Sequence, residues 1–133
     1  MPHRPVFWEA TIWSAKNLIK RGKFYEAMYR LDQMKEDPAL ASELRGELYA
    51  TRANVYLIQD RYEEAIPELK EAIQFTSPRR QKARYAFILG QLYQMANRPV
   101  SSDEYFTLAL RQHPSYDMTF HARMNLLINQ SLQ

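Results

Sequence analysis

Cysteine is missing from this chain of 133 residues, and glycine occurs only three times. The lack of cysteine excludes disulfide bonds, thiol catalysis and cysteine-based metal sites. So few glycines argue against an all-β protein with many tight turns. No apolar run approaches the roughly 20 residues that cross a bilayer, and the first residues lack the apolar core of a signal peptide. We therefore expect a soluble segment that does not insert directly into a membrane.

A large charge of one sign is also absent, because the net charge is only +3. That value is too small to indicate a nucleic-acid partner. The glycines are isolated, so no loop could cradle a phosphate, and the three histidines are too far apart to match a metal-ligand motif. The carboxylate runs fall on expected outer helix faces beside basic residues, which is typical of a solvated surface. We expect no enzyme activity, no metal and no cofactor.

The segment from residue 49 to residue 78 predicts a helical hairpin, because small and large apolar residues recur at helical spacing on both sides of one turn. Small residues at Ala53 and Ala65 would let two helices cross closely. The order of aromatic, small and proline positions resembles the tetratricopeptide repeat (TPR). The positions that carry the resemblance are Tyr49, Ala53, Tyr56, Tyr62, Ala65, Leu69, Ala72 and Pro78.

The hairpin pattern occurs three times. Ala27 repeats the position of Ala65 with a spacing of 38 residues, and Gly90 repeats that of Ala53 with a spacing of 37 residues. Ideal TPRs recur about every 34 residues. The extra length is expected between residues 34 and 49, as a longer loop or a longer helix.

The predicted fold class is therefore all-α, a right-handed α-solenoid of three TPR helical hairpins plus a C-terminal helix. Each repeat leaves an apolar face that only a neighbouring repeat can cover. We expect one TPR domain over residues 1–133, with repeats at about 6–36, 38–76 and 78–113 and a final helix at about 116–131.

Glycine, proline and helix-capping residues indicate where the helices are expected to begin and end. Gly22 suits the left-handed position that ends the first helix. Asp37 and the proline after it are expected to begin a long third helix, Pro38 to Ile58. Asp60 with Glu63 forms an acidic variant of the capping box before the fourth helix.

Two prolines affect later helices. Pro67 lies inside the fourth helix, where it cannot donate to the carbonyl of Glu63 and typically costs about 3 kcal/mol, so we expect it on the outer face. The sixth helix has two possible starts. Pro99 could be its first residue, or Ser101 with Glu104 could form a capping box and begin it later.

A more specific resemblance covers about residues 7–125. It is to the TPR region of PorW/SprE-type lipoproteins of Bacteroidetes, which belong to the gliding-motility and type IX secretion machinery. The resemblance implies a periplasm-facing lipoprotein at the outer membrane that contacts other secretion components; the lipidated cysteine of that family is absent here. The matching runs are QDRYEEAI at 59–66, KARY at 82–85, ILGQLY at 88–93, HPSY at 113–116 and FHARMN at 120–125.

The expected function is a non-catalytic scaffold that binds a protein or peptide partner. In TPR proteins the first helix of each hairpin lines the concave face, and a spacing of three to four selects one stripe per helix. On the first helix the stripe also includes Glu9 and Ile12, and on the third Glu47, Ala50 and Ile58. The candidate partner-binding residues are Lys16, Lys20, Asn54, Arg80, Arg84, Phe87, Gln91 and Gln94.

Other interpretations stay open. The outer face or adjacent repeats could bind instead. The basic run at residues 79–84 could be a solvated helix start, an acidic-peptide contact or, least favoured, an RNA contact. A chaperone-docking TPR adaptor that clamps an acidic peptide is the alternative function. In the adaptors that this alternative resembles, the clamp includes Lys and Asn at the fifth and ninth places of the first helix. This chain has Ile12 and Lys16 at those places. Arg84 matches one further basic place and Ile88 departs from another.

The final helix has no second helix to complete its hairpin. Leu126, Leu127 and Ile128 cannot all face inward, so we expect an exposed apolar patch or self-association there. The small-residue slot of this incomplete repeat falls at Met124 for a period of 34, with Ala122 two residues away. Trp8 and Trp13 could close the amino-terminal end of the stack or pack against a preceding repeat.

Overall fold

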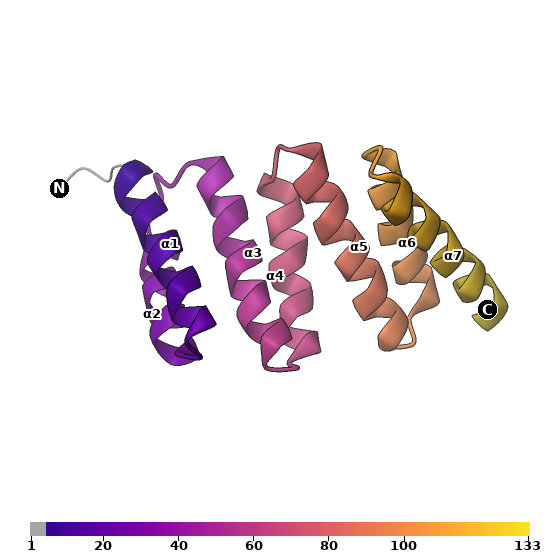
Figure 1. Ribbon diagram of the computed structural model, residues 1–133, viewed down its shortest axis with the longest axis horizontal. Coiled ribbons are helices and arrows are strands. Elements are labelled where there is room, and N and C mark those ends of the chain that lie inside the picture. Colours follow the sequence, from indigo (N-terminus) through magenta and orange to yellow (C-terminus); the bar gives the residue numbers. More distant parts are fainter. Residues whose placement is uncertain (1–4) are drawn as a thin grey trace. The chain divides into compact units, whose positions relative to one another are not determined.

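The computed structural model describes residues 5–133, and the chain over that range is all-α (Figure 1). The chain forms two compact units, and the boundary between them along the sequence lies between Phe75 and Thr76. We call them the N-terminal unit and the C-terminal unit. The helices are α1 (Pro5–Lys20), α2 (Phe24–Lys35), α3 (Ser42–Ile58), α4 (Tyr62–Phe75), α5 (Arg79–Met95), α6 (Pro99–Arg111) and α7 (Tyr116–Leu132).

The N-terminal unit consists of two helical hairpins, α1 with α2 and α3 with α4. In addition, α3 packs against both helices of the first hairpin. Small residues lie where the helices approach closely, and Ala15, Ala27, Ala53 and Ala65 are all fully buried. The expectation for Ala53 is confirmed. Larger side chains such as Leu31 fill the space around these crossings.

The connection between α2 and α3 corrects the predicted start of the third helix. Asp37 is buried, and its carboxylate accepts hydrogen bonds from Trp8 Nε1 at 2.8 Å and from the Ala39 amide at 2.9 Å. The Arg45 guanidinium donates to the Asp37 carbonyl at 3.1 Å. These bonds hold the segment after α2 in a turn, so α3 begins only at Ser42. The extra length of this repeat is therefore a loop.

A buried cation joins three helices of the N-terminal unit. Arg52 on α3 donates through Nε and Nη2 to the Glu68 carboxylate on α4, at 2.9 and 3.2 Å. It also pairs with Asp32 on α2. Burial lowers the pKa of Arg52, but the hydrogen bonds and charges of the two carboxylates outweigh it, so the pKa is raised overall. The ion pairs thus keep Arg52 charged inside the unit.

Each hairpin turn uses the same backbone geometry. Gly22, Asp60 and Asn97 have positive φ angles of 75°, 59° and 61°. The next residue in each turn donates its amide to the carbonyl five residues back, as Arg61 does to Tyr56 at 2.8 Å. These are Schellman motifs, and they satisfy carbonyls at the end of the preceding helix.

The capping box expected at Asp60 is wrong. A left-handed residue at the end of α3 cannot also adopt the extended conformation of an N-cap. Instead, the Asp60 carboxylate accepts a hydrogen bond from the Tyr62 hydroxyl at 2.8 Å. Pro67 is exposed within α4, which confirms its predicted place on the outer face.

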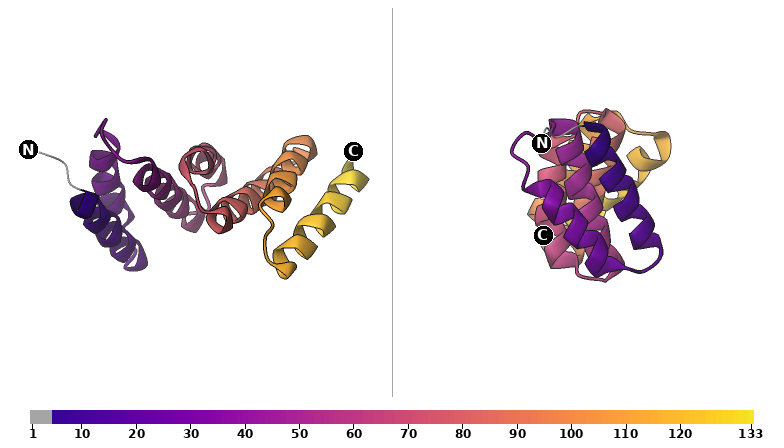
Figure 2. Two further views of the ribbon diagram at one scale, coloured as in Figure 1. Left: turned by 90° about the horizontal axis from the view of Figure 1, so that it is seen from above. Right: turned by 90° about the vertical axis from the view of Figure 1, so that its left-hand side faces the viewer.

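The C-terminal unit is one hairpin, α5 with α6, and α7 packs mainly against α6 (Figure 2). Gly90 lies against the ring of Phe106, and a Cβ atom placed there would come within 2.8 Å of two ring carbons. Ser102 donates its hydroxyl to the Gly90 carbonyl at 2.7 Å. The helices therefore approach at Gly90 as the repeat pattern predicts.

The structure decides between the two possible starts of the sixth helix and between the two candidate small residues of the final helix. Helix α6 begins at Pro99, the first of its two proposed starts. Ala122 on α7 is fully buried, whereas Met124 is exposed, so Ala122 occupies the small-residue slot. Ser115 caps α7 by accepting a hydrogen bond from the Met118 amide at 3.2 Å.

Among the aromatic positions that carry the repeat pattern, Tyr49 and Tyr56 are half-buried, whereas Tyr62 is 38% exposed. Trp8 belongs to the core, whereas Trp13 is 70% exposed. No helix within the described residues combines the length and the apolar character that crossing a membrane requires.

Candidate functional site

Helix α5 presents a stripe of long polar side chains to solvent. Arg80, Arg84 and Gln91 are exposed, and they fall on one side of the helix at spacings of four and seven. The opposite side packs against the rest of the unit, which fixes the rotation of the helix. Its buried residues are Ala83, Ala86, Leu89, Gly90, Leu92 and Tyr93.

Met95 completes this stripe, and the sequence prediction missed it. It is 63% exposed and lies four residues after Gln91, beside it on the same face. The pattern did contain a signal, because the spacing of four that linked Arg80 to Arg84 also reaches Met95 from Gln91. We use the name α5 face for Arg80, Arg84, Gln91 and Met95.

Two of the predicted site residues on α5 are engaged inside the unit. Phe87 is half-buried, and its ring packs edge-on against Phe106 with centroids 5.4 Å apart. Gln94 donates its side-chain amide to the Asn129 side chain at 2.9 Å and to the Asn125 carbonyl at 3.4 Å. These residues border the α5 face and hold α6 and α7 in place.

The charge around the α5 face is positive. Residues 76–133 contain seven basic residues (Lys or Arg) and three acidic residues (Asp or Glu), a net charge of +4. Residues 1–75 contain eleven basic and twelve acidic residues, a net charge of −1. The first turn of α5 has no acidic residue, and its N-cap, Pro78, makes no side-chain cap. Among the described residues, neither Arg80 nor Arg84 forms an ion pair. Both guanidiniums are therefore open to an added carboxylate.

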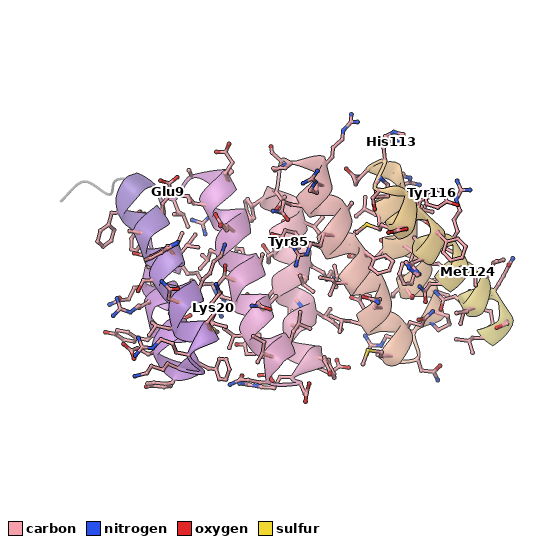
Figure 3. The ribbon with its side chains drawn as sticks, viewed as in Figure 1. Glu9, Lys20, Tyr85, His113, Tyr116 and Met124 are labelled. Atoms are coloured by element: carbon pink, nitrogen blue, oxygen red, sulfur yellow. The ribbon has the colours of Figure 1, made fainter. Side chains whose placement is uncertain are left out.

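The predicted stripes on α1 and α3 come together within the N-terminal unit. Lys16 on α1 donates to the Glu47 carboxylate on α3 at 2.8 Å, and both side chains are about half-exposed. Lys20 and Asn54 are exposed along the same two helices, and Figure 3 shows Lys20 near the end of α1. Lys16 already has an internal carboxylate partner, unlike the arginines of the α5 face.

Ile12 does not belong to the predicted stripe. It is 3% exposed and lies in the apolar core with Trp8 and Ala15. Its place on the helix turns it toward α2 and α3, because the core side of α1 is wider than the stripe assumed. The face of α1 therefore keeps Glu9, Lys16 and Lys20 only.

These positions do not assemble the carboxylate clamp considered from the sequence. The fifth place of α1 is the buried Ile12, and the ninth is Lys16, which pairs with Glu47. Ile88 is a half-buried apolar residue, so Arg84 remains as the one matching cation.

Metal binding finds no support in this arrangement. Among the described residues, no group of three His, Asp or Glu side chains lies close enough to hold a metal ion. The shifted pKa values have structural causes. The hydrogen bond from Arg61 lowers the pKa of Glu64, and the hydrogen bond to Asp60 raises that of Tyr62.

Solved structures of TPR domains have a similar fold. One is the N-terminal domain of stress-induced protein-1 (STI-1) from C. elegans, with a TM-score of 0.73 and 15% identity, covering 89% of this chain and 93% of that chain. Another is described as the TPR2AB-domain:pHSP90-complex of yeast Sti1. Its TM-score is 0.72 and its identity 15%, over 96% of this chain and 49% of that one, so this chain spans about half its length.

At 15% identity these matches establish the fold alone, which is all-α and built from TPR-type helical hairpins. No protein-family model matches the chain, and a search of curated proteins finds no match either. Neither structural match supports the resemblance to type IX secretion lipoproteins, which stays a prediction from the sequence.

Proposed function

We propose that this protein is a non-catalytic interaction module whose α5 face binds a segment of another protein that carries acidic side chains. One observation carries the proposal: two exposed guanidiniums, which pair with no carboxylate in the part of the chain that the structure describes, lie in line with an amide and an exposed methionine. Guanidiniums bind carboxylates through paired hydrogen bonds. Gln91 could bond the backbone of the segment, and Met95 could cover an apolar side chain.

The fold supports this proposal, and so does the description of the yeast Sti1 structure as a complex with pHSP90. That description favours the peptide-adaptor form of the function over the secretion form. The α5 face differs from the clamp in having no second basic place at Ile88, so it should recognise side-chain carboxylates and not require a free carboxyl terminus.

The experiment compares the binding of two 12-residue peptides. In one, leucine alternates with glutamate, and in the other, leucine alternates with lysine. We expect the glutamate peptide to shift the NMR signals of Arg84, Gln91 and Met95, and the lysine peptide to leave them unchanged. Amidation of the carboxyl terminus should not weaken binding. Rejection of the amidated peptide would instead indicate a terminal-carboxylate clamp.

A charge reversal in the α5 face tests the assignment of residues. Arg84→Glu should weaken the glutamate peptide about tenfold and flatten the dependence of its association rate on salt, because rim charges act mainly on association. Arg111→Glu is the matched control, since Arg111 is an exposed arginine on α6 and not on α5. If both variants weakened peptide binding equally, the affinity would depend only on the net charge of the protein. That result would contradict a site on α5.

A narrower form of the proposal places the partner within type IX secretion, on the periplasmic side of the outer membrane. It rests on the sequence runs at 82–93 and 113–125 alone. Crosslinking of the intact protein in its own cell envelope, followed by identification of what is captured, tests this form. Capture of chaperones in place of envelope components would refute it and leave the binding site unaffected.

A further inference from the structure

The outer side of α7 carries a ridge of apolar residues spaced four apart. Figure 3 labels Tyr116 and Met124 on this helix. All five members are between 43% and 85% exposed, so the ridge remains uncovered within the C-terminal unit. We use the name α7 ridge for Tyr116, Phe120, Met124, Ile128 and Leu132.

A buried polar network holds this ridge on the outside. Asn129, on the inner side of α7, is fully buried. Its amide donates to the Ser102 hydroxyl at 2.8 Å and to the Asp103 carboxylate at 2.9 Å, while its oxygen accepts from Gln94 at 2.9 Å. Rotating the helix to bury the ridge would leave these buried polar groups without partners, which is unfavourable.

The ridge is self-complementary about its centre. Under a two-fold axis at Met124, Phe120 of one copy faces Ile128 of the other, and Tyr116 faces Leu132. Each pair places an aromatic against an aliphatic side chain. Rows of residues four apart on two helices run parallel to each other when the helices cross at about −50°, the commonest packing class in globular proteins. A two-fold contact of this kind closes after two copies.

The charge pattern of α7 agrees with self-pairing. The ridge contains no charged residue, and Leu127, which is 62% exposed, widens it. Asp117 and Arg123 are the only Asp, Glu, Lys or Arg residues of the helix, and both lie beside the ridge. Two copies can therefore approach without burying the charge of an Asp or Arg side chain, which would oppose association.

We propose that two copies of this chain form a dimer through the α7 ridge, with Met124 of one copy against Met124 of the other. A helix of 17 residues is about 25 Å long. Its contact is smaller than the roughly 800 Å² per partner of a standard interface. We therefore expect a weak dimer in rapid exchange with monomer, which needs no contribution from the α5 face.

A charge-swap experiment tests this geometry. Met124→Lys and Met124→Glu each place two like charges at the two-fold axis, and each should weaken self-association at least about tenfold. An equimolar mixture of the two variants should associate again, because opposite charges then meet at the axis. Sedimentation equilibrium over a concentration series measures all three samples, and circular dichroism checks that the helices are retained.

Val100 provides the matched control. It is a 72% exposed apolar residue on α6 of the same unit, so Val100→Lys and Val100→Glu should leave self-association unchanged. A wild-type protein that sediments as a monomer at millimolar concentration would overturn the proposal and leave the ridge to a different partner. So would Met124 variants that associate as the wild type does, or a mixture that associates no better than its components.

Discussion

Gly90 shows how much of this fold depends on one missing methyl group. Its neighbour is the ring of Phe106, a fully buried side chain. The carbonyl of Gly90 also accepts the Ser102 hydroxyl, which fixes the backbone of α5 against α6. A larger residue must therefore displace either the ring or the helix.

The first prediction follows from this contact. Gly90→Ala adds helix propensity of roughly 1 kcal/mol, but overpacking typically costs about 1–3 kcal/mol. We expect a net loss of stability of about 1 kcal/mol, and a larger loss for Gly90→Leu. Thermal and urea unfolding measure both.

A second background separates the two effects. In Phe106→Leu the neighbouring ring is gone, so Gly90→Ala should become neutral or stabilising relative to that background. If Gly90→Ala raised the melting temperature in the otherwise unchanged protein, the close approach at this position would be contradicted.

At the scale of the element, α4 tolerates an interior proline because its ring faces solvent. The helix still lacks the amide of residue 67, which would have bonded to the Glu63 carbonyl. Pro67→Ala restores that donor. We expect stabilisation of about 1–2 kcal/mol, since the interior proline penalty of about 3 kcal/mol is partly offset by greater freedom of the unfolded chain.

Lys70→Ala is the control for Pro67→Ala, because Lys70 is exposed on the same helix and its amide is already present. It should change the free energy of unfolding by less than about 0.5 kcal/mol. A lower melting temperature for Pro67→Ala would mean that the proline shapes α4 in a way its neighbours require.

The helices themselves could be predicted from the sequence, but several of their contacts could not. Small residues at Ala53 and Gly90 located the crossings because only small side chains permit close approach. The start of α3 was missed because Asp37 acts through a hydrogen bond from Trp8, a residue 29 positions away. Local patterns carry no information on such a partner.

The candidate site was predictable to a similar degree. Helical spacing placed Arg84 and Gln91 on one exposed stripe. It could not show that Gln94 binds Asn129, because that bond requires the position of α7 against α5. The same limit explains Ile12, whose burial depends on how two other helices pack around α1.

At the scale of the whole molecule, each unit has its own buried polar centre. Arg52 ties α2, α3 and α4 together, and Asn129 ties α7 to α5 and α6. Within the described residues, the side-chain partners of Arg52 and of Asn129 all lie in the same unit as the residue itself. Substituting Arg52 or Asn129 should therefore change the stability of one unit at a time.

We expect Arg52→Met to increase amide hydrogen exchange in α2 to α4 and to leave α5 to α7 protected. Removing one partner of a buried pair costs about 3–5 kcal/mol. Asn129→Ala should do the reverse, at a cost of about 1–3 kcal/mol. Hydrogen exchange followed by mass spectrometry reads both variants, and equal exchange increases across both units would contradict separate centres.

The repeated Schellman turn has a consequence for how such a chain could change. Gly22, Asp60 and Asn97 occupy one backbone conformation, and all three are residue types that tolerate a positive φ. The joint between the two helices of a hairpin therefore needs only one residue that tolerates a positive φ, and it lies at the surface, apart from the buried crossings. Recombination at two successive joints would pass on whole helices with their packing faces intact, so the exchanged segment would be the second helix of one hairpin together with the first helix of the next.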